Sequence, residues 1–348
     1  MEIIYSSRDF QKWLLKGFEI SEDSPLLIDR FLNQAIEVDV DAICDGEEVL
    51  ICGVMEQIQE AGVHSGDSAC TLPPVSLSVE IQAELERQTK VIALELKVVG
   101  LLNIQFAIEA GLVYVLEVNP RASRTVPFAS KARGVSFAKM AMKVMTGKKL
   151  KELGRVPTKL DLVYVKESVF PFNKFTGTDI ILGPEMRSTG EVMGVGNSFA
   201  EAFGKATIAA GNRIPQKGTA FLSVKDGDKP QTLKVAKQLA ELGFELMGTI
   251  GTSQYLQKHG VSIRTVNKVN EGRPHIVDLI KNGDVNLVIN TSALGVHEVG
   301  AAYELRKTTV AQNIAYFTTI TAATAGVAAI AEIRKVPIRV HCLQEREL

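Results

Sequence analysis

The sequence has few of the features that mark disulfide-rich, membrane-spanning or nucleic-acid-binding proteins. Its 348 residues include only four cysteines, and none of them has the close spacing of a metal-binding pair. A chain of this length can bury a core without disulfides, so a reducing cytoplasmic location is expected. The 39 basic and 40 acidic residues leave no excess positive charge for a nucleic acid. The N-terminus has no signal-peptide pattern, and the apolar stretch 318–333 is too short to span a bilayer, so no membrane partner is expected.

The first part of the chain has the pattern of an antiparallel α+β structure. The dipeptide Asp45-Gly46 joins two alternating segments and is a strong hairpin signal. A second hairpin is expected around the three-residue loop 110–112, and a long amphipathic helix precedes it. The predicted elements here are strands over 26–32, 36–44, 49–55, 103–108 and 113–118, and a helix over 77–98.

After Gly211 the pattern changes to strands that alternate with helices. This alternation predicts a parallel, doubly wound α/β sheet. The expected strands cover 220–224, 244–248, 261–266, 286–290 and 314–318. Residues 157–203 are rich in Gly and Pro and are predicted to be irregular. The sequence therefore predicts three regions: residues 1–146, a connector over 147–210, and a second domain over 211–348.

Polar side chains gather on the second predicted hairpin. If residues 110–112 form its loop, Gln105 lies opposite Glu117, and Asn119 shares the strand face of Glu117 because side chains alternate with a period of two. Three oxygen-bearing side chains then converge, as Mg²⁺ or Mn²⁺ bound together with phosphates requires. Arg121 and Arg124 follow, in position to contact phosphate oxygens. The spacing alone is equally compatible with a solvated polar hairpin face.

Two other polar segments are weaker signals. Glu37, Asp39 and Asp41 alternate with apolar residues, which is typical of the solvent-exposed face of a half-buried strand. The glycines of the loop 62–67 permit a close approach of backbone to a ligand. His64 alone, in that loop, is more typical of a polar surface residue.

In the predicted parallel sheet, hydroxyl and amide side chains follow two strands. The segments 249–252 and 290–292 lie at carboxyl ends of strands, where open α/β sheets bind ligands. Together with Lys229 and Lys268 they predict an anion site, while ordinary helix capping remains the alternative for each residue.

Several long segments resemble the large subunit of carbamoyl phosphate synthetase, in the order in which that family has them. The resemblance covers nearly the whole chain and corresponds to the C-terminal part of that subunit. The segments that carry it are 37–46 (EVDVDAICDG), 61–68 (AGVHSGDS), 117–127 (EVNPRASRTVP), 171–175 (PFNKF) and 182–194 (LGPEMRSTGEVMG).

The resemblance implies a partial ATP-grasp domain, an antiparallel sheet with helices, that lacks its N-terminal lobe. The implied reaction is ATP-dependent phosphorylation of carbamate, a ligase activity of arginine and pyrimidine biosynthesis, with ATP and Mg²⁺ or Mn²⁺ as cofactors. The implied metal ligands are Gln105, Glu117 and Asn119, and the implied catalytic residues are Arg121 and Arg124. The implied ATP contacts are Arg30, Leu32, Glu37, Gly62, Val63, His64, Ser65, Gln105 and Glu117.

For the second domain, the resemblance is to the methylglyoxal-synthase-like allosteric domain that ends the family's large subunit. It implies a site for a nucleoside monophosphate, formed by Ser223, Lys229, Thr249, Thr252, Lys268, Asn290 and Ser292. It also implies an ornithine site formed by Asp67, Glu167, Tyr316 and Thr318, in which Gln59 stands where the family has an acidic residue.

The implied partners are the glutaminase small subunit, the N-terminal part of a large subunit, the effectors IMP, UMP and ornithine, and a second copy in a homo-oligomer. The chain alone is expected to be catalytically incomplete. One alternative is a stand-alone regulatory module that binds nucleoside monophosphates. Another is a phosphate lyase of the methylglyoxal-synthase type, which is less favoured because the segment 271–275 lacks that family's catalytic aspartate.

Overall fold

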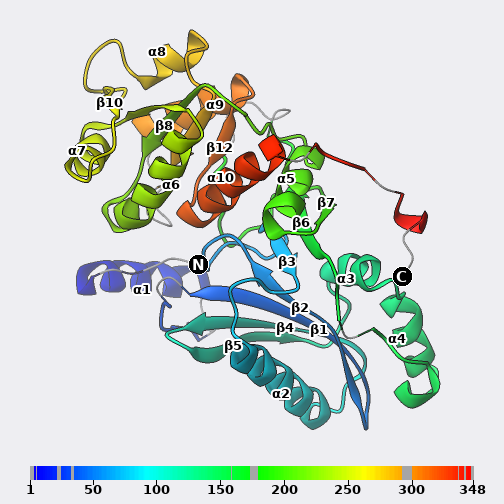
Figure 1. Cartoon of the computed structure of the whole chain (residues 1–348). Helices are drawn as coiled ribbons and strands as arrows, with labels where there is room; N and C mark the ends of the chain where they lie inside the picture. The colour runs from blue at the N-terminus through cyan, green and yellow to red at the C-terminus, as the bar shows by residue number, and fades with distance from the viewer. Residues whose placement is uncertain are drawn as a thin grey trace.

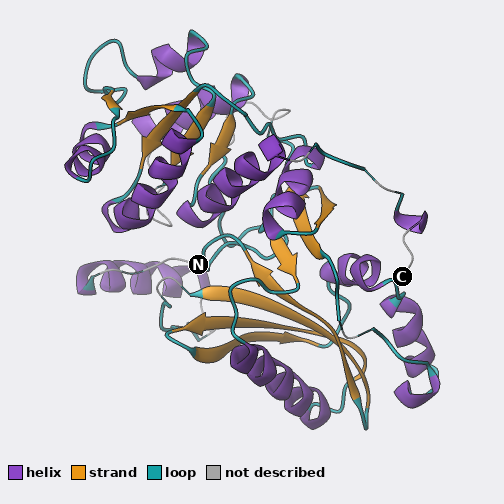
Figure 2. Ribbon diagram, in the orientation of Figure 1, coloured by secondary structure: helices purple, strands orange, loops and turns teal. Residues whose placement is uncertain are grey.

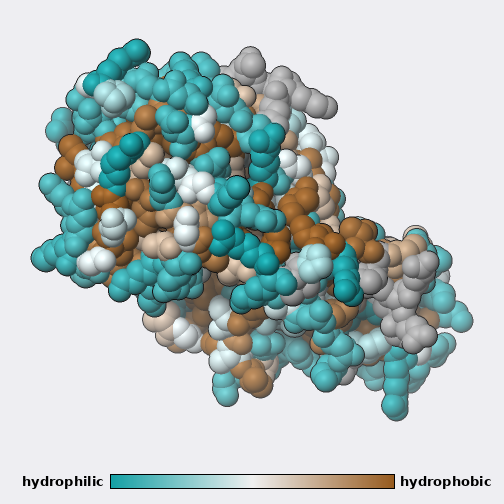
Figure 3. Space-filling model, turned by 45° about the horizontal axis from the view of Figure 1, so that its top comes forward, coloured by the Kyte–Doolittle hydropathy of each residue, from teal (hydrophilic) through white to brown (hydrophobic). Residues whose placement is uncertain are grey.

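The structure is a computed structural model of the chain in which two sheets, each with its own helices, form two units (Figure 1). It describes residues 4, 6–21, 25–32, 35–157, 159–172, 179–291, 300–335, 337–340 and 342–345. Polar and charged side chains cover much of the face seen in Figure 3, and small hydrophobic patches interrupt them. Within the described ranges, no helix combines the length and the apolar character needed to cross a membrane.

The first unit is built on a seven-stranded antiparallel sheet with the strand order β5-β4-β1-β2-β3-β6-β7 (Figure 2). Its strands are β1 (Ile36–Asp45), β2 (Val49–Gln57), β3 (Cys70–Leu72), β4 (Val99–Glu109), β5 (Leu112–Asn119), β6 (Val163–Val169) and β7 (Gly190–Gly196). Its helices are α1 (Ser7–Ser21), α2 (Val79–Glu95), α3 (Thr125–Arg133), α4 (Phe137–Met145) and α5 (Phe199–Ala209), with a 3₁₀ turn at Leu150–Glu152.

The helices leave one part of the sheet to polar residues. Helix α2 covers one face, where Leu85 and Ala93 pack against Val38, Val40 and the apolar residues of β4. On the opposite face, α3 and α4 pack over the end of β1 that contains Ile43. The other end of that face carries Asp39 and Asp41. This polar end of the sheet, which α3 and α4 do not cover, is the candidate site.

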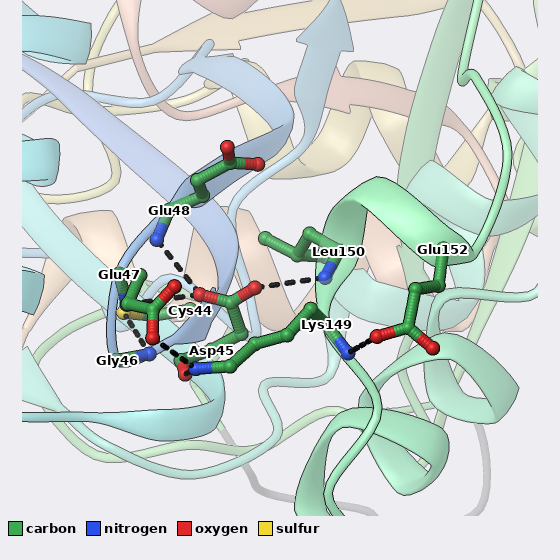
Figure 4. A network of polar contacts seen from close by, with 8 residues as sticks. All are labelled: Cys44, Asp45, Gly46, Glu47, Glu48, Lys149, Leu150 and Glu152. Carbon is green, nitrogen blue, oxygen red and sulfur yellow. Dashed lines mark hydrogen bonds and ion pairs between the residues drawn. The ribbon is translucent and has the colours of Figure 1, made fainter.

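The turn between β1 and β2 shows how the sequence fixes this hairpin (Figure 4). The carboxylate of Asp45 accepts the backbone N–H groups of Glu47 and Glu48 at 2.9 and 2.7 Å. Its other oxygen accepts the N–H of Leu150 at 2.8 Å. Burial raises the pKa of Asp45, but these three hydrogen bonds outweigh it and the pKa lies below its ordinary value. The predicted Asp45-Gly46 turn is confirmed, with Gly46 at φ +85°.

Two local predictions for the first unit were wrong. Residues 25–32 contain no strand. The segment 157–203, predicted to be irregular, contributes β6 and β7 to the sheet and begins α5. The boundaries at 146 and 210 remain predictions, although β6 and β7 belong to the same sheet as β1.

The second unit contains a five-stranded parallel sheet with the order β10-β9-β8-β11-β12, as the alternating pattern predicted. The strands are β8 (Thr219–Ser223), β9 (Glu245–Gly248), β10 (Arg264–Thr265), β11 (Leu287–Asn290) and β12 (Ala315–Phe317). The helices are α6 (Lys229–Glu241), α7 (Ile250–Lys258), α8 (Ile276–Lys281), α9 (Ala301–Ala311) and α10 (Ile320–Lys335), with 3₁₀ turns at Asp226–Asp228 and Leu343–Glu345. Separate hydrophobic clusters fill the two faces, so the sheet is doubly wound.

The two units meet along α5 and α10. Ala202, Phe203 and Ala206 of α5 form one hydrophobic cluster with Ala325 and Ala329 of α10. Helix α5 lies so close to β7 that a Cβ atom at Gly194 would stand 2.0 Å from the carbonyl oxygen of Ala202. Only glycine fits at that position, which explains why β7 has so little strand character in its sequence.

Candidate functional site

The polar end of the seven-stranded sheet is a grid of two rows across three strands. In the first row, Asp39 of β1 pairs with Gln105 of β4, which pairs with Glu117 of β5. In the second row, Asp41 pairs with Asn103, which pairs with Asn119. The predicted pairing of Gln105 with Glu117 is therefore confirmed, and Asn119 lies beside them.

The three predicted metal ligands keep oxygen atoms for a cation. Gln105 donates its Nε2 to the Oγ of Ser65 at 2.9 Å. Asn119 donates its Nδ2 to Oε1 of Glu117 at 2.7 Å. Each amide therefore uses its nitrogen atom as a donor, and Oε1 of Glu117 accepts one of the two bonds. A carboxylate with two amide oxygens is a donor set that suits Mg²⁺ or Mn²⁺, so the residues present fit the implied metal.

The acidic residues of β1 are not on a solvated face, so that prediction was wrong for Asp39 and Asp41. Their exposed fractions are 3% and 0%. Asn103 donates to both, at 3.3 Å to Asp39 and 3.0 Å to Asp41, and Gln57 donates to Asp39. Burial raises the pKa of Asp39, and it raises that of Asp41 to about 6 against the hydrogen bonds that lower it. These buried residues thus lie beside the predicted ligands Gln105 and Asn119 in the sheet.

Glu37 lies at the edge of this grid. Its carboxylate accepts the backbone N–H of Gly62 at 2.9 Å. Burial raises its pKa to about 7, opposed by the hydrogen bond from Gly62 and assisted by the charge of Asp39. The predicted ATP contacts Glu37 and Gly62 are therefore adjacent.

Side chains of β6 form hydrogen bonds to the loop that contains Val63, His64 and Ser65. The buried Lys166 donates its Nζ to the carbonyl of Ser65 at 3.0 Å. The hydroxyl of Ser168 donates to the carbonyl of Gly66 at 2.8 Å. His64 accepts the N–H of Gly66 at 3.0 Å on its Nδ1, so its side chain serves the loop itself. Lys166 was not predicted from the sequence. A lysine within the apolar segment VYVKESV does, however, indicate a buried charge with a specific partner.

The other predicted residues of this site lie around the grid. Arg121 and Arg124 are exposed on the loop that follows β5. Arg121 donates its Nη1 to the carbonyl of Ala122 at 3.1 Å. Arg30 is a surface residue that pairs with Glu109 at 3.4 Å, and Leu32 is half-buried. The ion pair of Arg30 is thus with a residue outside the grid, and within the described ranges no group of three His, Cys, Asp or Glu residues could hold a metal ion.

The second predicted site is at the carboxyl edge of the parallel sheet. The Oγ1 of Thr249 lies 3.4 Å from the Oγ of Ser223 and 3.3 Å from the Oγ1 of Thr252. Asn290 donates its Nδ2 to the carbonyl of Ser223 at 3.1 Å. The Nζ of Lys229 lies 3.6 Å from where a Cβ on Gly251 would stand, at the start of α7. The structure therefore brings most of the predicted effector residues together.

Two of the predicted effector residues are not among those that the structure brings together. Lys268 is exposed, and its backbone N–H donates to the carboxylate of Glu271 at 2.9 Å. Ser292 lies outside the described residues.

A cavity between the units contains most of the predicted ornithine residues. Glu167, Tyr316, Thr318 and Gln59 line it. Asp67 does not; its carboxylate instead accepts the N–H groups of Arg187 and Ser188 at 2.7 and 2.8 Å. Burial raises the pKa of Glu167 to about 7, and burial with the nearby charge of Glu167 raises that of Tyr316.

One ion pair connects the second site to the first unit. Arg306 of α9 is 2% exposed and donates two hydrogen bonds to Asp179, at 2.7 and 2.6 Å. Its third nitrogen lies 3.5 Å from Oδ1 of Asn290. The segment that begins at Asp179 reaches the first site, where the N–H of His64 donates to the carbonyl of Gly183 at 2.8 Å.

Comparison with known families agrees with this arrangement. A family model described as "Carbamoyl-phosphate synthase L chain, ATP binding domain" matches residues 1–153, and one described as "MGS-like domain" matches residues 231–318. The carbamoyl phosphate synthase large chain of Pasteurella multocida is 54% identical over 326 residues, which are 93% of this chain and 30% of the relative. This chain belongs to the carbamoyl phosphate synthase large-chain family.

Other large chains of the family match in the same way. The carbamoyl phosphate synthase large chain of Pseudomonas putida is 54% identical over 92% of this chain and 30% of its own length. That of Haemophilus ducreyi is 50% identical over 100% of this chain and 32% of its own length. The chain thus spans about 30% of the length of these relatives and corresponds to their C-terminal part.

Among solved structures, the biotin carboxylase domain of a thermophilic 2-oxoglutarate carboxylase is 13% identical, with a TM-score of 0.44 over 56% of this chain and 50% of that one. The fold assignment rests instead on the two family models and on the observed sheets.

Proposed function

We propose that this chain supplies the ATP site at which a carbamoyl phosphate synthase large chain phosphorylates carbamate. The observation that carries this proposal is the placement of Gln105, Glu117 and Asn119 side by side on β4 and β5, with both amide nitrogens engaged as hydrogen-bond donors. Arginines at the end of the same hairpin are in position to contact phosphate. The metal, when bound, would neutralise phosphate charge and orient the phosphoryl group.

The chain's own residues contribute positioning and charge. Glu37 accepts from Gly62 and thereby fixes the backbone along which we place the nucleotide. Lys166 and Ser168 hold the following residues of that loop. Arg121 and Arg124 would stabilise the negative charge of the transferring phosphoryl group, because such catalysis consists mainly of positioning and electrostatic stabilisation.

We further propose that the carboxyl edge of the parallel sheet binds a nucleoside monophosphate effector such as IMP or UMP. The cluster of Ser223, Thr249, Thr252 and Asn290, with Lys229 near the start of α7, supports this proposal. The cavity lined by Glu167, Tyr316 and Thr318 is our candidate for ornithine, with Gln59 in place of one acidic residue. We favour a regulatory role over the lyase alternative because the segment 271–275 lacks the catalytic aspartate of the lyase family.

The proposed partners are the remainder of a large chain, a glutaminase small subunit and a second copy. Because the chain spans about 30% of its relatives, we expect it to bind Mg·ATP without synthesising carbamoyl phosphate alone. We propose the units 1–146, 147–210 and 211–348 as its functional divisions.

Titration calorimetry of this chain with Mg·ATP, IMP and UMP tests these assignments. We expect Mg·ATP and at least one monophosphate to bind at the same time, because the two sites lie on different sheets. Competition between Mg·ATP and the monophosphate for one site would contradict the proposal, as would the absence of Mg·ATP binding in the millimolar range.

A further inference from the structure

Asp41 is a completely buried carboxylate beneath the loop that carries the two arginines. Its Oδ1 accepts the hydroxyl of Ser123 at 2.7 Å and the amide of Asn103 at 3.0 Å. Its Oδ2 accepts the hydroxyl of Thr125 at 2.6 Å. The three donors to this carboxylate are neutral groups. A buried carboxylate is costly unless it is hydrogen-bonded, so these three bonds define its environment.

The hydrogen bonds that Asp41 accepts hold Ser123 and Thr125, the residues on both sides of Arg124. Ser123 donates its hydroxyl to Asp41 and accepts the N–H of Val126 at 3.2 Å on the same oxygen. The hydroxyls of Ser123 and Thr125 are 2.8 Å apart. Because both neighbours of Arg124 are held at the buried carboxylate, the backbone between them is fixed and the Arg124 side chain remains exposed.

The grid links the same carboxylate to the proposed metal ligands. Asn103, which donates to Asp41 and Asp39, pairs across the sheet with Asn119. The N–H of Arg121 donates to the carbonyl of Asn119 at 2.8 Å. The loop 121–125 is therefore attached at its first residue to a proposed ligand and at its last residue to Asp41.

We propose that Asp41 is a positioning residue that fixes the loop 121–125 so that Arg121 and Arg124 face the phosphates of a bound nucleotide. This inference rests on the proposed function of the site. Asp41 itself touches no substrate; it acts through Ser123 and Thr125.

The variant Asp41→Asn tests the proposal in the full 348-residue chain, because an amide NH₂ cannot accept the hydrogen bonds that the carboxylate accepts. The matched control is Asp45→Asn, a buried aspartate on the same strand whose partners are Glu47 and Glu48 of the hairpin turn and Leu150 of the 3₁₀ turn. Ser123→Ala leaves Asp41 its bonds from Asn103 and Thr125, removes the hydroxyl that contacts Asp41, Thr125 and the N–H of Val126, and serves if Asp41→Asn does not fold.

Two measurements are needed: amide hydrogen exchange of the segment 119–126, and the affinities for Mg·ATP and Mg·ADP by calorimetry. For Asp41→Asn we expect faster exchange in this segment and Mg·ATP affinity lowered roughly tenfold, on the scale of a lost hydrogen bond to a charged group. We also expect the ratio of ATP to ADP affinity to fall, which a general loss of stability would not cause. Asp45→Asn should change exchange at its own turn and leave that ratio unchanged.

The outcomes separate the two claims. Unchanged exchange in 119–126, or an unchanged ATP-to-ADP ratio with faster exchange, overturns the role of Asp41. If the wild-type chain binds neither nucleotide, the proposed function fails, and the exchange measurement still decides whether Asp41 orders the loop.

Discussion

The two sheets of this molecule build their polar sites in different ways. On the seven-stranded sheet, the buried Asp39, Asp41 and Asn103 lie next to Gln105 and Asn119, and the bonds that Asp41 accepts from the loop are 2.6 and 2.7 Å long. On the five-stranded sheet, the hydroxyls of Thr249 and Thr252 contact each other at 3.3 Å, longer than a typical O–H···O bond.

This difference indicates how much each site depends on its ligand. In the first proposed site, buried carboxylates hold Asn103, Ser123 and Thr125, so this part of the site is ordered without a ligand. The second has weakly bonded hydroxyls and an exposed Lys268, so a bound phosphate would supply the strongest contacts there. Four predictions test this contrast, beginning with the largest expected effect.

The ion pair between Arg306 and Asp179 is expected to make the largest contribution, because it joins the second site to the first unit. Arg306→Ala should lower the free energy of unfolding by about 3–5 kcal/mol, since it leaves Asp179 without its partner in a largely buried place. Urea denaturation measures this. The control is the exposed neighbour Lys307→Ala, whose pair with Glu304 is 4.0 Å long. If Arg306→Ala lowers the free energy of unfolding no more than Lys307→Ala does, the pair does not stabilise the contact between the units.

Stability should also depend on pH through Glu167. Its folded pKa of about 7 lies above the ordinary 4.5, so the folded state holds the proton more tightly. The resulting stability is complete below pH 4.5 and is lost as the pH rises through 7. Relative to Glu167→Gln, the wild type should lose at most about 3 kcal/mol between these limits.

Denaturation curves of both proteins from pH 4.5 to 8 measure this loss, with the exposed Glu191→Gln on the neighbouring strand as control. Parallel curves for wild type and Glu167→Gln would argue against a carboxyl group buried in the cavity.

Lys268 tests the second site directly. Lys268→Ala in the full chain should weaken the binding of IMP or UMP by about 1.5–3 kcal/mol, the scale of a lost hydrogen bond to a charged group. The fold should persist, because Lys268 is exposed. Calorimetric titration measures the change, with the exposed Lys258→Ala on α7 as the matched variant. Equal affinities in the two variants would remove Lys268 from the site.

Glu117 tests the first site. Its charge balances a divalent cation in a way that the neutral amides of Gln105 and Asn119 cannot. In a complete large chain, Glu117→Gln should slow phosphoryl transfer at least about tenfold, roughly 1.4 kcal/mol. Turnover under saturating Mg·ATP measures this, with the exposed Glu80→Gln on α2 as control. Near-normal turnover would count against the grid as a metal site.

The sequence predicted the central pair of this grid correctly, but through two errors that cancel. The loop was expected to contain three residues, 110–112. Instead, Glu109 pairs with Leu112, and only Ala110 and Gly111 form the turn, both with positive φ. A shift of register after Gln105 then restores its pairing with Glu117. A bulge inside a strand has no reliable signal in a single sequence.

The burial of Asp39 and Asp41 could not be predicted from the alternation of polar and apolar residues along β1. The residues that bind Asp41 come from positions 103, 123 and 125, far along the chain. The strand β7 was missed for a different reason, because Gly194 and Gly196 weaken its pattern while permitting the approach of α5. In both cases the tertiary contact decided what the local sequence could not.

The helix pair α5 and α10 gives the molecule a further property. Ala202 and Ala206 face Ala325 and Ala329, and a Cβ at Gly204 would meet the Ile333 side chain at 2.9 Å. If one unit unfolds alone, the apolar contact between α5 and α10 becomes exposed to water. This exposure raises the free energy of any state in which only one unit is folded. The chain should therefore unfold in a single calorimetric transition, and the two proposed nucleotide sites should be lost at one temperature.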